Sequence, residues 1–151
     1  MSKVKLLSFD VLGVPVPAPR PSVGRKGVYM DKRSEHWKAQ VRDEADDAMR
    51  LVGWKSPSGP VAIRVEFVMV RRGKAADGPL AHAIRPDLDN LLKLVMDAMT
   101  LAKVYKDDGC VSAIVASKRW QRPGERFAGV TVSVSMASTA RDDRPTLGEE
   151  E

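Results

Sequence analysis

The densest group of potentially reactive side chains in this chain is the stretch Arg85-Pro-Asp-Leu-Asp-Asn-Leu-Leu-Lys93. Its two carboxylates, Asp87 and Asp89, are separated by one residue, and Lys93 follows four residues after the second. A second acidic pair, Asp107-Asp108, comes later in the chain. Carboxylate oxygens are ligands that Mg²⁺ prefers, and a nearby lysine can neutralise charge that develops on a phosphate. This combination indicates a divalent-metal site for phosphodiester chemistry.

A purely structural explanation exists for the same acids. Asp87 follows a proline and suits the N-cap of a helix, and Asp89 in the first turn would complement the helix dipole. Asp89 and Lys93 could form a surface salt bridge worth about 0.3 kcal/mol. The metal-site hypothesis expects Asp107-Asp108 to join the first pair at one end of the helix. Carboxylates gathered in this way repel one another unless a cation such as Mg²⁺ neutralises them.

The charge of the chain points toward a polyanionic partner. The 151 residues carry a net charge of +5, with a pI of about 9.5. From residue 137 onward two arginines stand against five acids, which leaves +8 on residues 1–136. Such a balance favours binding to nucleic acid and says nothing about the fold.

Several classes of protein are excluded by what the sequence lacks. A single cysteine, Cys110, excludes an intrachain disulfide and a cysteine-based zinc cluster, and the two histidines are isolated from each other. No P-loop, serine-hydrolase or zinc-protease motif is present, so no small-molecule cofactor is expected. The chain has no apolar run of about 20 residues and no signal-peptide core, so we expect a cytoplasmic protein without a membrane partner.

Hydrophobic periodicity predicts an α+β domain in residues 1–136, with elements in the order β-α-β-α-β-β. We expect a mostly antiparallel or mixed four-stranded sheet with the helices packed against it, and a hairpin-like connection at residues 121–126. The polar tail, residues 137–151, is expected to be disordered. The predicted strands are residues 3–12, 61–70, 111–120 and 127–136, and the predicted helices are residues 32–52 and 88–102.

Two basic loops could bring cations to a DNA backbone. The first, residues 13–27, contains four prolines and three glycines, which forbid regular structure. It could be a simple solvated connection, or an arm whose cations reach phosphates at low entropic cost. The second loop, residues 71–79, is similarly basic. The candidate DNA contacts are Arg20, Arg25 and Lys26 in the first loop, Arg71 and Arg72 in the second, and Arg85 in the acidic block.

The acidic block resembles the core motif of the RusA family of Holliday junction resolvases. The resemblance rests on Arg85–Lys93, on Asp97-Ala98 and on Tyr105-Lys-Asp-Asp-Gly-Cys-Val111, at the family's spacing and without a gap. The proline-rich segment from Val14 to Pro21 is similar to the family's N-terminal loop. One departure is Gly109-Cys110, where family members commonly carry a small residue and a glutamine.

The resemblance implies a small, homodimeric, Mg²⁺-dependent endonuclease that acts on branched DNA and is often encoded by phages or prophages. The matching residues comprise three metal-binding aspartates, a catalytic lysine and a supporting acid: Asp87, Asp89, Asp108, Lys93 and Asp107. The expected function is resolution of Holliday junctions by paired symmetric nicks during DNA recombination and repair. We expect each chain of a two-fold dimer to contribute its own complete site, because two strands must be cut symmetrically.

Two other functions remain open from the sequence. The acids could be structural in a non-catalytic DNA-binding accessory protein, or the chain could be a less selective metal-dependent nuclease. Aromatic residues make up 5% of the chain, so a stacking platform for single strands is not expected.

Overall fold

The elements of the chain follow the predicted order β-α-β-α-β-β. A computed structural model describes residues 6–19, 31–71 and 78–137. The α+β fold and both helices agree with the sequence prediction, with shifts of one or two residues at several ends; residues 3–5 of the first predicted strand lie outside the described residues. The elements are strand β1 (Leu6–Leu12), helix α1 (Lys32–Val52), strand β2 (Val61–Met69), helix α2 (Leu88–Leu101), the short 3₁₀ helix η2 (Asp108–Cys110), strand β3 (Val111–Trp120) and strand β4 (Gly129–Met136).

The four strands form one mixed sheet in the order β1-β4-β2-β3. Strand β4 runs antiparallel to both β1 and β2, whereas β2 and β3 are parallel because α2 crosses over between them. The prediction of a hairpin-like connection at residues 121–126 is therefore wrong. Strand β2 lies between β3 and β4, so that connection spans a neighbouring strand.

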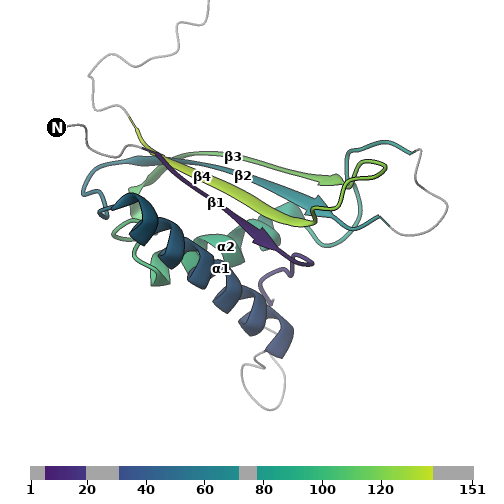
Figure 1. Cartoon of the computed structure of the whole chain (residues 1–151), viewed down its shortest axis with the longest axis horizontal. Coiled ribbons are helices and arrows are strands. Elements are labelled where there is room, and N and C mark those ends of the chain that lie inside the picture. Colours follow the sequence, from purple (N-terminus) through teal and green to yellow (C-terminus); the bar gives the residue numbers. More distant parts are fainter. Residues whose placement is uncertain (1–5, 20–30, 72–77, 138–151) are drawn as a thin grey trace, which may run out of the picture.

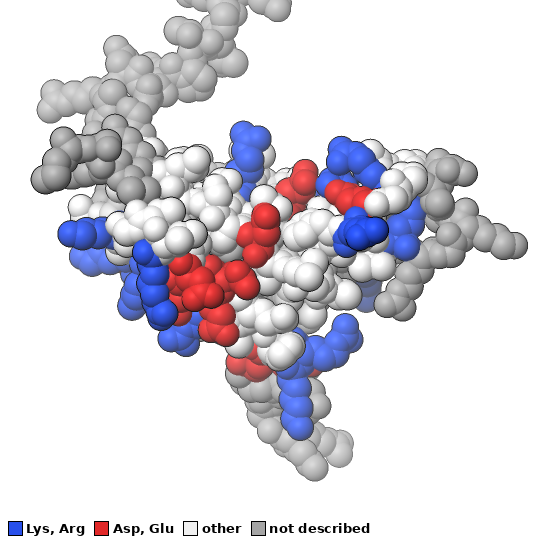
Figure 2. Space-filling model, in the orientation of Figure 1, with Lys and Arg blue, Asp and Glu red and all other residues white. Residues whose placement is uncertain are grey.

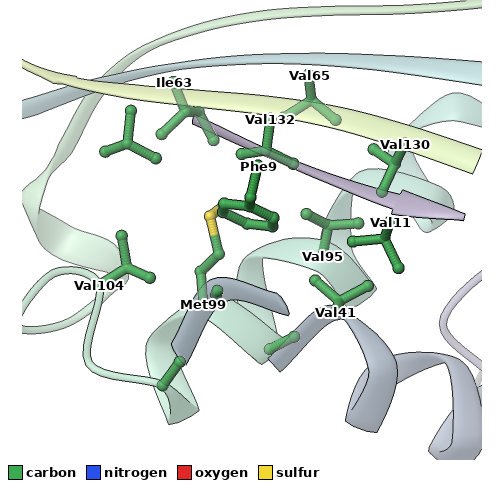
Figure 3. Packing of buried hydrophobic residues seen from close by; sticks show 14 of the residues in the cluster. Phe9, Val11, Val41, Ile63, Val65, Val95, Met99, Val104, Val130 and Val132 are labelled. Carbon is green, nitrogen blue, oxygen red and sulfur yellow. The ribbon is translucent and has the colours of Figure 1, made fainter. Parts of the chain in front are cut away.

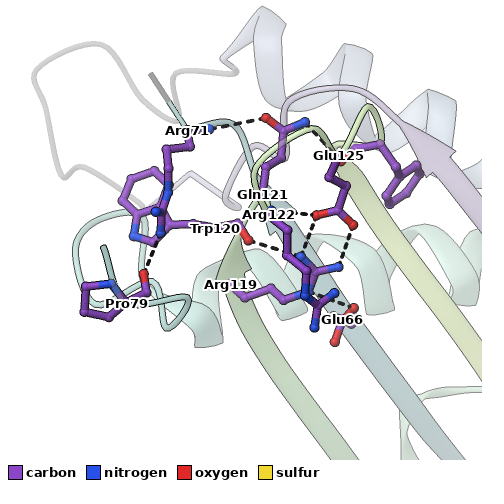
Figure 4. Close-up of polar contacts among 9 residues, drawn as sticks. Glu66, Arg71, Pro79, Arg119, Trp120, Gln121, Arg122 and Glu125 are labelled. Atoms are coloured by element: carbon purple, nitrogen blue, oxygen red, sulfur yellow. Dashed lines mark hydrogen bonds and ion pairs between the residues drawn. The ribbon is translucent and has the colours of Figure 1, made fainter. Parts of the chain in front are cut away.

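Salt bridges hold this connection against the sheet. The Arg119 guanidinium donates to both carboxylate oxygens of Glu125, at 2.7 and 2.8 Å, and its Nε lies 3.4 Å from Glu66 on β2 (Figure 4). The hydrogen bonds from Arg119 are the main cause that lowers the pKa of Glu125 to about 2. The connection is thus fixed by charge-assisted contacts in place of strand pairing.

Both helices cover the same face of the sheet (Figure 1). Alternation along the strands turns Leu7, Phe9 and Val11 of β1 toward the helices, and Val130 and Val132 of β4 join them in the core. The opposite face of the sheet, in the part of the chain described, carries no helix (Figure 1).

The core between sheet and helices positions α2. Val95 and Met99 of α2 pack with Phe9 and Val132 from the sheet, and Val41 of α1 closes the same cluster (Figure 3). All five side chains are buried, and burial of each stabilises the fold by roughly 1.5–3 kcal/mol. The helix that carries the acidic block is therefore anchored along one side, and its other side remains available for function.

None of the helices in the described parts of the chain is long and apolar enough to cross a bilayer. The predicted tail lies outside the described residues apart from Ala137, whose amide donates to the carbonyl of Pro60.

Candidate active site

The first acidic pair lies at the start of α2. Asp87 is the N-cap residue, with extended backbone (φ −68°, ψ 140°), and its half-buried side chain makes no capping hydrogen bond. Asp89 is exposed in the first turn, where its Oδ1 accepts from the amide of Asn90 at 2.9 Å. The capping role expected from the structural explanation is thus not performed by the Asp87 carboxylate.

A groove of about 500 Å³ opens beside this pair. Its walls are residues 16–19, which belong to the proline-rich segment, and the first residues of both helices. The amide of Ala18 donates to the carbonyl of Asn90 at 2.9 Å and joins the two walls. Arg33 and Arg85 line the groove together with Asp31 and Asp87, so two cations and two carboxylates face one open space. This arrangement can bind a phosphate next to a metal site.

The second acidic pair lies at the other end of α2. The Oδ1 of Asp108 is 2.5 Å from the hydroxyl of Thr100, in the last turn of the helix. Asp107 caps η2 by accepting from the amide of Gly109 at 2.7 Å. A Cβ at position 109 would lie 2.8 Å from this Asp107 oxygen, so a glycine at the Gly109-Cys110 departure suits the local geometry.

The two pairs do not meet within one chain. Asp87 and Thr100 are thirteen residues apart on a continuous helix, which corresponds to about 20 Å at 1.5 Å per residue. Among the residues that the structure describes, no three acidic, histidine or cysteine side chains form a group that could hold one metal ion. The expected convergence at one helix end is therefore not found, because the first pair lies at the start of α2 and the connection after the helix keeps Asp108 beside Thr100, in its last turn.

Tyr105 fixes the segment that leads to the second pair. Its ring is fully buried and its hydroxyl donates to the carbonyl of Met96 at 3.0 Å. Burial is the main cause that raises the pKa of Tyr105 to about 12, and the nearby carboxylates of Asp108 and Asp97 raise it further. The tyrosine therefore stays a neutral hydrogen-bond donor and holds the chain before Asp107 against α2.

Lys93 is exposed on α2, one turn beyond Asp89 and one turn before Asp97. This spacing places all three side chains along one flank of the helix, outside the buried stripe.

The candidate DNA contacts divide into three groups. Arg85 is exposed and lines the groove. Arg71 is engaged within the fold, because its guanidinium donates to the carbonyls of Gly78 and Pro79 and lies 5.7 Å from the ring centre of Trp120 (Figure 4). Four others lie outside the described residues: Arg20, Arg25, Lys26 and Arg72.

Three residues near the acids were not expected from the sequence. Arg33 reaches the groove because α1 begins beside α2, Thr100 contacts Asp108, and Lys118 contacts the chain just before Asp87. Arg33 follows Asp31, the N-cap residue of α1, and this pattern could have suggested an arginine at the start of that helix. No local pattern signals Lys118, since its partners are 32 and 34 residues away in the chain.

The exposed surface of α1 is strongly acidic at its middle. Asp43, Glu44 and Asp47 are exposed there beside the exposed Arg42, and acidic side chains gather into one patch over this helix (Figure 2). A patch of this sign repels DNA phosphates, so DNA should approach away from the middle of α1.

The comparison with known families defines the class of this protein. The family model described as Endodeoxyribonuclease RusA matches residues 13–135. The chain belongs to the RusA family, as its acidic block suggested. Membership makes it an endodeoxyribonuclease, a hydrolase of DNA, and implies action on Holliday junctions, which are branched DNA. A search of curated proteins found no match.

Proposed function

We propose that this protein is a Mg²⁺-dependent, structure-selective endodeoxyribonuclease that resolves Holliday junctions by paired symmetric nicks in DNA recombination and repair. The observation that carries the proposal is the paired aspartates at the start of α2, beside a groove that Arg33 and Arg85 line. Family membership supports the nuclease chemistry.

The carboxylates present suit a magnesium ion. Mg²⁺ is commonly held by one or two carboxylates, several waters and substrate phosphate, and Asp87 and Asp89 supply that minimum. When bound, the ion would supply an activated water and would neutralise charge on the cleaved phosphate. Asp108, supported by Asp107, would complete the ligand set.

The cations around the pair would position and stabilise the DNA backbone. Lys93 shares a flank of α2 with Asp89, so its ammonium is suited to act on charge that develops on the phosphate. Arg33 and Arg85 would bind phosphates in the groove. The cations predicted as DNA contacts from the sequence, Arg20, Arg25, Lys26 and Arg72, would add to the attraction for DNA.

A dimer would reunite the separated acidic pairs. If two α2 helices lie antiparallel across a two-fold axis, the start of each helix lies beside the end of its partner. One protomer's Asp87 and Asp89 could then face the partner's Asp108. Helix α2 and strand β3 contact each other and expose Leu101 (48%) and Ile114 (45%), apolar side chains that such an interface would cover. This arrangement replaces the expected dimer in which each chain holds a complete site.

The decisive experiment is cleavage of a synthetic four-way junction with and without Mg²⁺, beside matched duplex, flap and fork substrates. We expect paired nicks in opposing strands that require the metal. Asp89→Asn keeps the shape of the side chain but removes the ligand charge, so we expect cleavage to be lost and junction binding to persist. Near-normal turnover of this variant would remove the metal assignment.

The same substrates separate the other functions. Binding of the junction without cleavage under any divalent metal would indicate a DNA-binding accessory protein. Equal cleavage of all four substrates would indicate a less selective nuclease.

A further inference from the structure

The chain before Asp87 runs along the outer edge of strand β3. The amide of Trp120 donates to the carbonyl of Leu80 at 2.7 Å, and the amide of His82 reaches the carbonyl of Lys118 at 3.4 Å. Between these contacts Ala81 forms an antiparallel bridge with Arg119. The edge strand therefore guides residues 80–82 toward the start of α2.

Beyond this pairing, the side chain of Lys118 holds the next residues of the segment in place. The Nζ of Lys118 donates to the carbonyl of Ile84 at 2.6 Å and to the carbonyl of Pro86 at 2.8 Å. The two acceptors flank Arg85, and the second belongs to the residue directly before Asp87. An ammonium group offers three donors and makes stronger hydrogen bonds than a neutral donor, so it orients both carbonyls firmly.

The register of the sheet explains why a lysine stands at this position. Lys118 pairs with Phe67 of β2, so its stem lies on the helix-covered face of the sheet, where it is half-buried. Its neighbour Arg119 is held by Glu125 and Glu66. In the part of the chain that the structure describes, Lys118 is the side chain that donates hydrogen bonds to the carbonyls of Ile84 and Pro86.

We infer that Lys118 is a positioning residue of the nuclease site: it sets the course of the chain into α2 and thereby the direction of Asp87 and Asp89. The inference rests on the proposed function, because it assigns these aspartates to the metal. Groups that orient metal ligands from behind typically account for 10–100-fold in metal affinity.

An alternative role for Lys118 predicts the opposite change in metal affinity. If Lys118 were only a positive charge near the aspartates, it would repel a divalent cation, and its removal would strengthen metal binding. If Lys118 positions the aspartates, its removal weakens metal binding. The sign of the change therefore distinguishes the two roles.

The experiment uses the full-length protein with Lys118→Met, Lys118→Arg and the control Lys55→Met, which changes an exposed lysine after α1. Mn²⁺ binding is titrated by calorimetry without DNA, and amide hydrogen exchange of residues 88–91 is measured in the metal-free protein. We expect Lys118→Met to weaken Mn²⁺ binding about tenfold and to speed exchange at the start of α2. Lys118→Arg should bind Mn²⁺ more tightly than Lys118→Met, and Lys55→Met should match the wild type.

Melting curves show whether each variant folds. If Lys118→Met does not fold, Lys118→Gln is used in its place, because glutamine keeps a hydrogen-bond donor and removes the charge. Weakened Mn²⁺ binding with faster amide exchange in Lys118→Gln would again support the inference. Unchanged or tighter Mn²⁺ binding in a folded Met or Gln variant would overturn the inference and leave the proposed function intact. Failure of the wild-type protein to bind Mn²⁺ and to cleave junctions would overturn both.

Discussion

At the scale of single residues, substitution of Lys93 tests whether this side chain acts in catalysis or only in a surface salt bridge. The side chain is exposed on α2 and one turn from Asp89. We expect Lys93→Ala to lower the single-turnover cleavage rate by about 100-fold, because charge on the phosphate loses its stabilising partner. Mn²⁺ affinity should change little, since the ammonium is not a ligand.

A salt bridge between Asp89 and Lys93 would give a different result. An exposed pair contributes about 1 kcal/mol or less, so Lys93→Ala would then lower the melting temperature slightly and leave cleavage intact. Single-turnover rates and melting curves on the same protein preparation decide between the two. Lys55→Ala, at another exposed lysine, serves as the control.

At the scale of the elements, Gly129 allows β4 to enter the sheet beside β1. Its φ is +150°, and a Cβ there would lie 1.9 Å from the carbonyl oxygen of Val11. Because that obstacle is backbone, we expect Gly129→Ala to lower the free energy of unfolding by about 3 kcal/mol or more. Gly124 is the matched control, with φ +78° and nothing within 4 Å of an added Cβ.

The expected cost at the control position is smaller. Gly124→Ala should lose only about 1–2 kcal/mol, from the left-handed backbone conformation alone. Urea unfolding of both variants measures the difference. Equal losses at the two positions would show that the approach of β4 to β1 is not tight.

At the scale of the whole molecule, the proposed shared site predicts complementation between two inactive variants. Asp89→Asn and Asp108→Asn should each abolish cleavage as homodimers. In a mixed dimer, one site carries both substitutions, and the other combines the intact Asp89 of one chain with the intact Asp108 of its partner. Unfolding and refolding the two variants together should therefore restore nicking of one junction strand.

The alternative dimer gives no such recovery. If each chain holds its own complete site, both sites of a mixed dimer carry one substitution and remain inactive. A nicking assay on a junction with each strand labelled in turn reads the outcome. Wild-type protein refolded in the same way controls for losses during reassembly.

Stability should also depend on pH through one buried histidine. His82 is 6% exposed and its ring contacts that of Trp120 in a tilted arrangement, with ring centres 4.2 Å apart. Burial, followed by the charge of Lys118, lowers the pKa of His82 below its ordinary 6.5. The unfolded chain therefore binds this proton more readily than the folded chain, so stability present above pH 6.5 is lost as the pH falls below that value.

We expect the melting temperature to fall between pH 7.5 and pH 5.5, and His82→Phe to reduce this dependence. His36→Gln, at an exposed histidine, is the matched control variant. A slope that persists in full in His82→Phe would assign the effect to other groups.

Local patterns in the sequence were sufficient for the elements and for the acidic residues. Asp31 caps α1 and Gly53 ends it in a left-handed conformation (φ 67°), so the predicted bounds of residues 32–52 agree with the structure. The apolar stripe of α2 and the alternation of the strands likewise depend on near neighbours. The family was also recognisable in the sequence, since its motif is a short continuous block.

Tertiary structure alone decided how these parts meet. Insertion of β4 between β1 and β2 depends on strand pairing across the whole sheet, which the spacing of β3 and β4 does not report. The contacts of Lys118 and Thr100 bring together residues on different elements. Most of all, the contact with Thr100 keeps Asp108 at the far end of α2 from Asp87, because the connection after the helix does not turn back along it and the helix rises by 1.5 Å per residue.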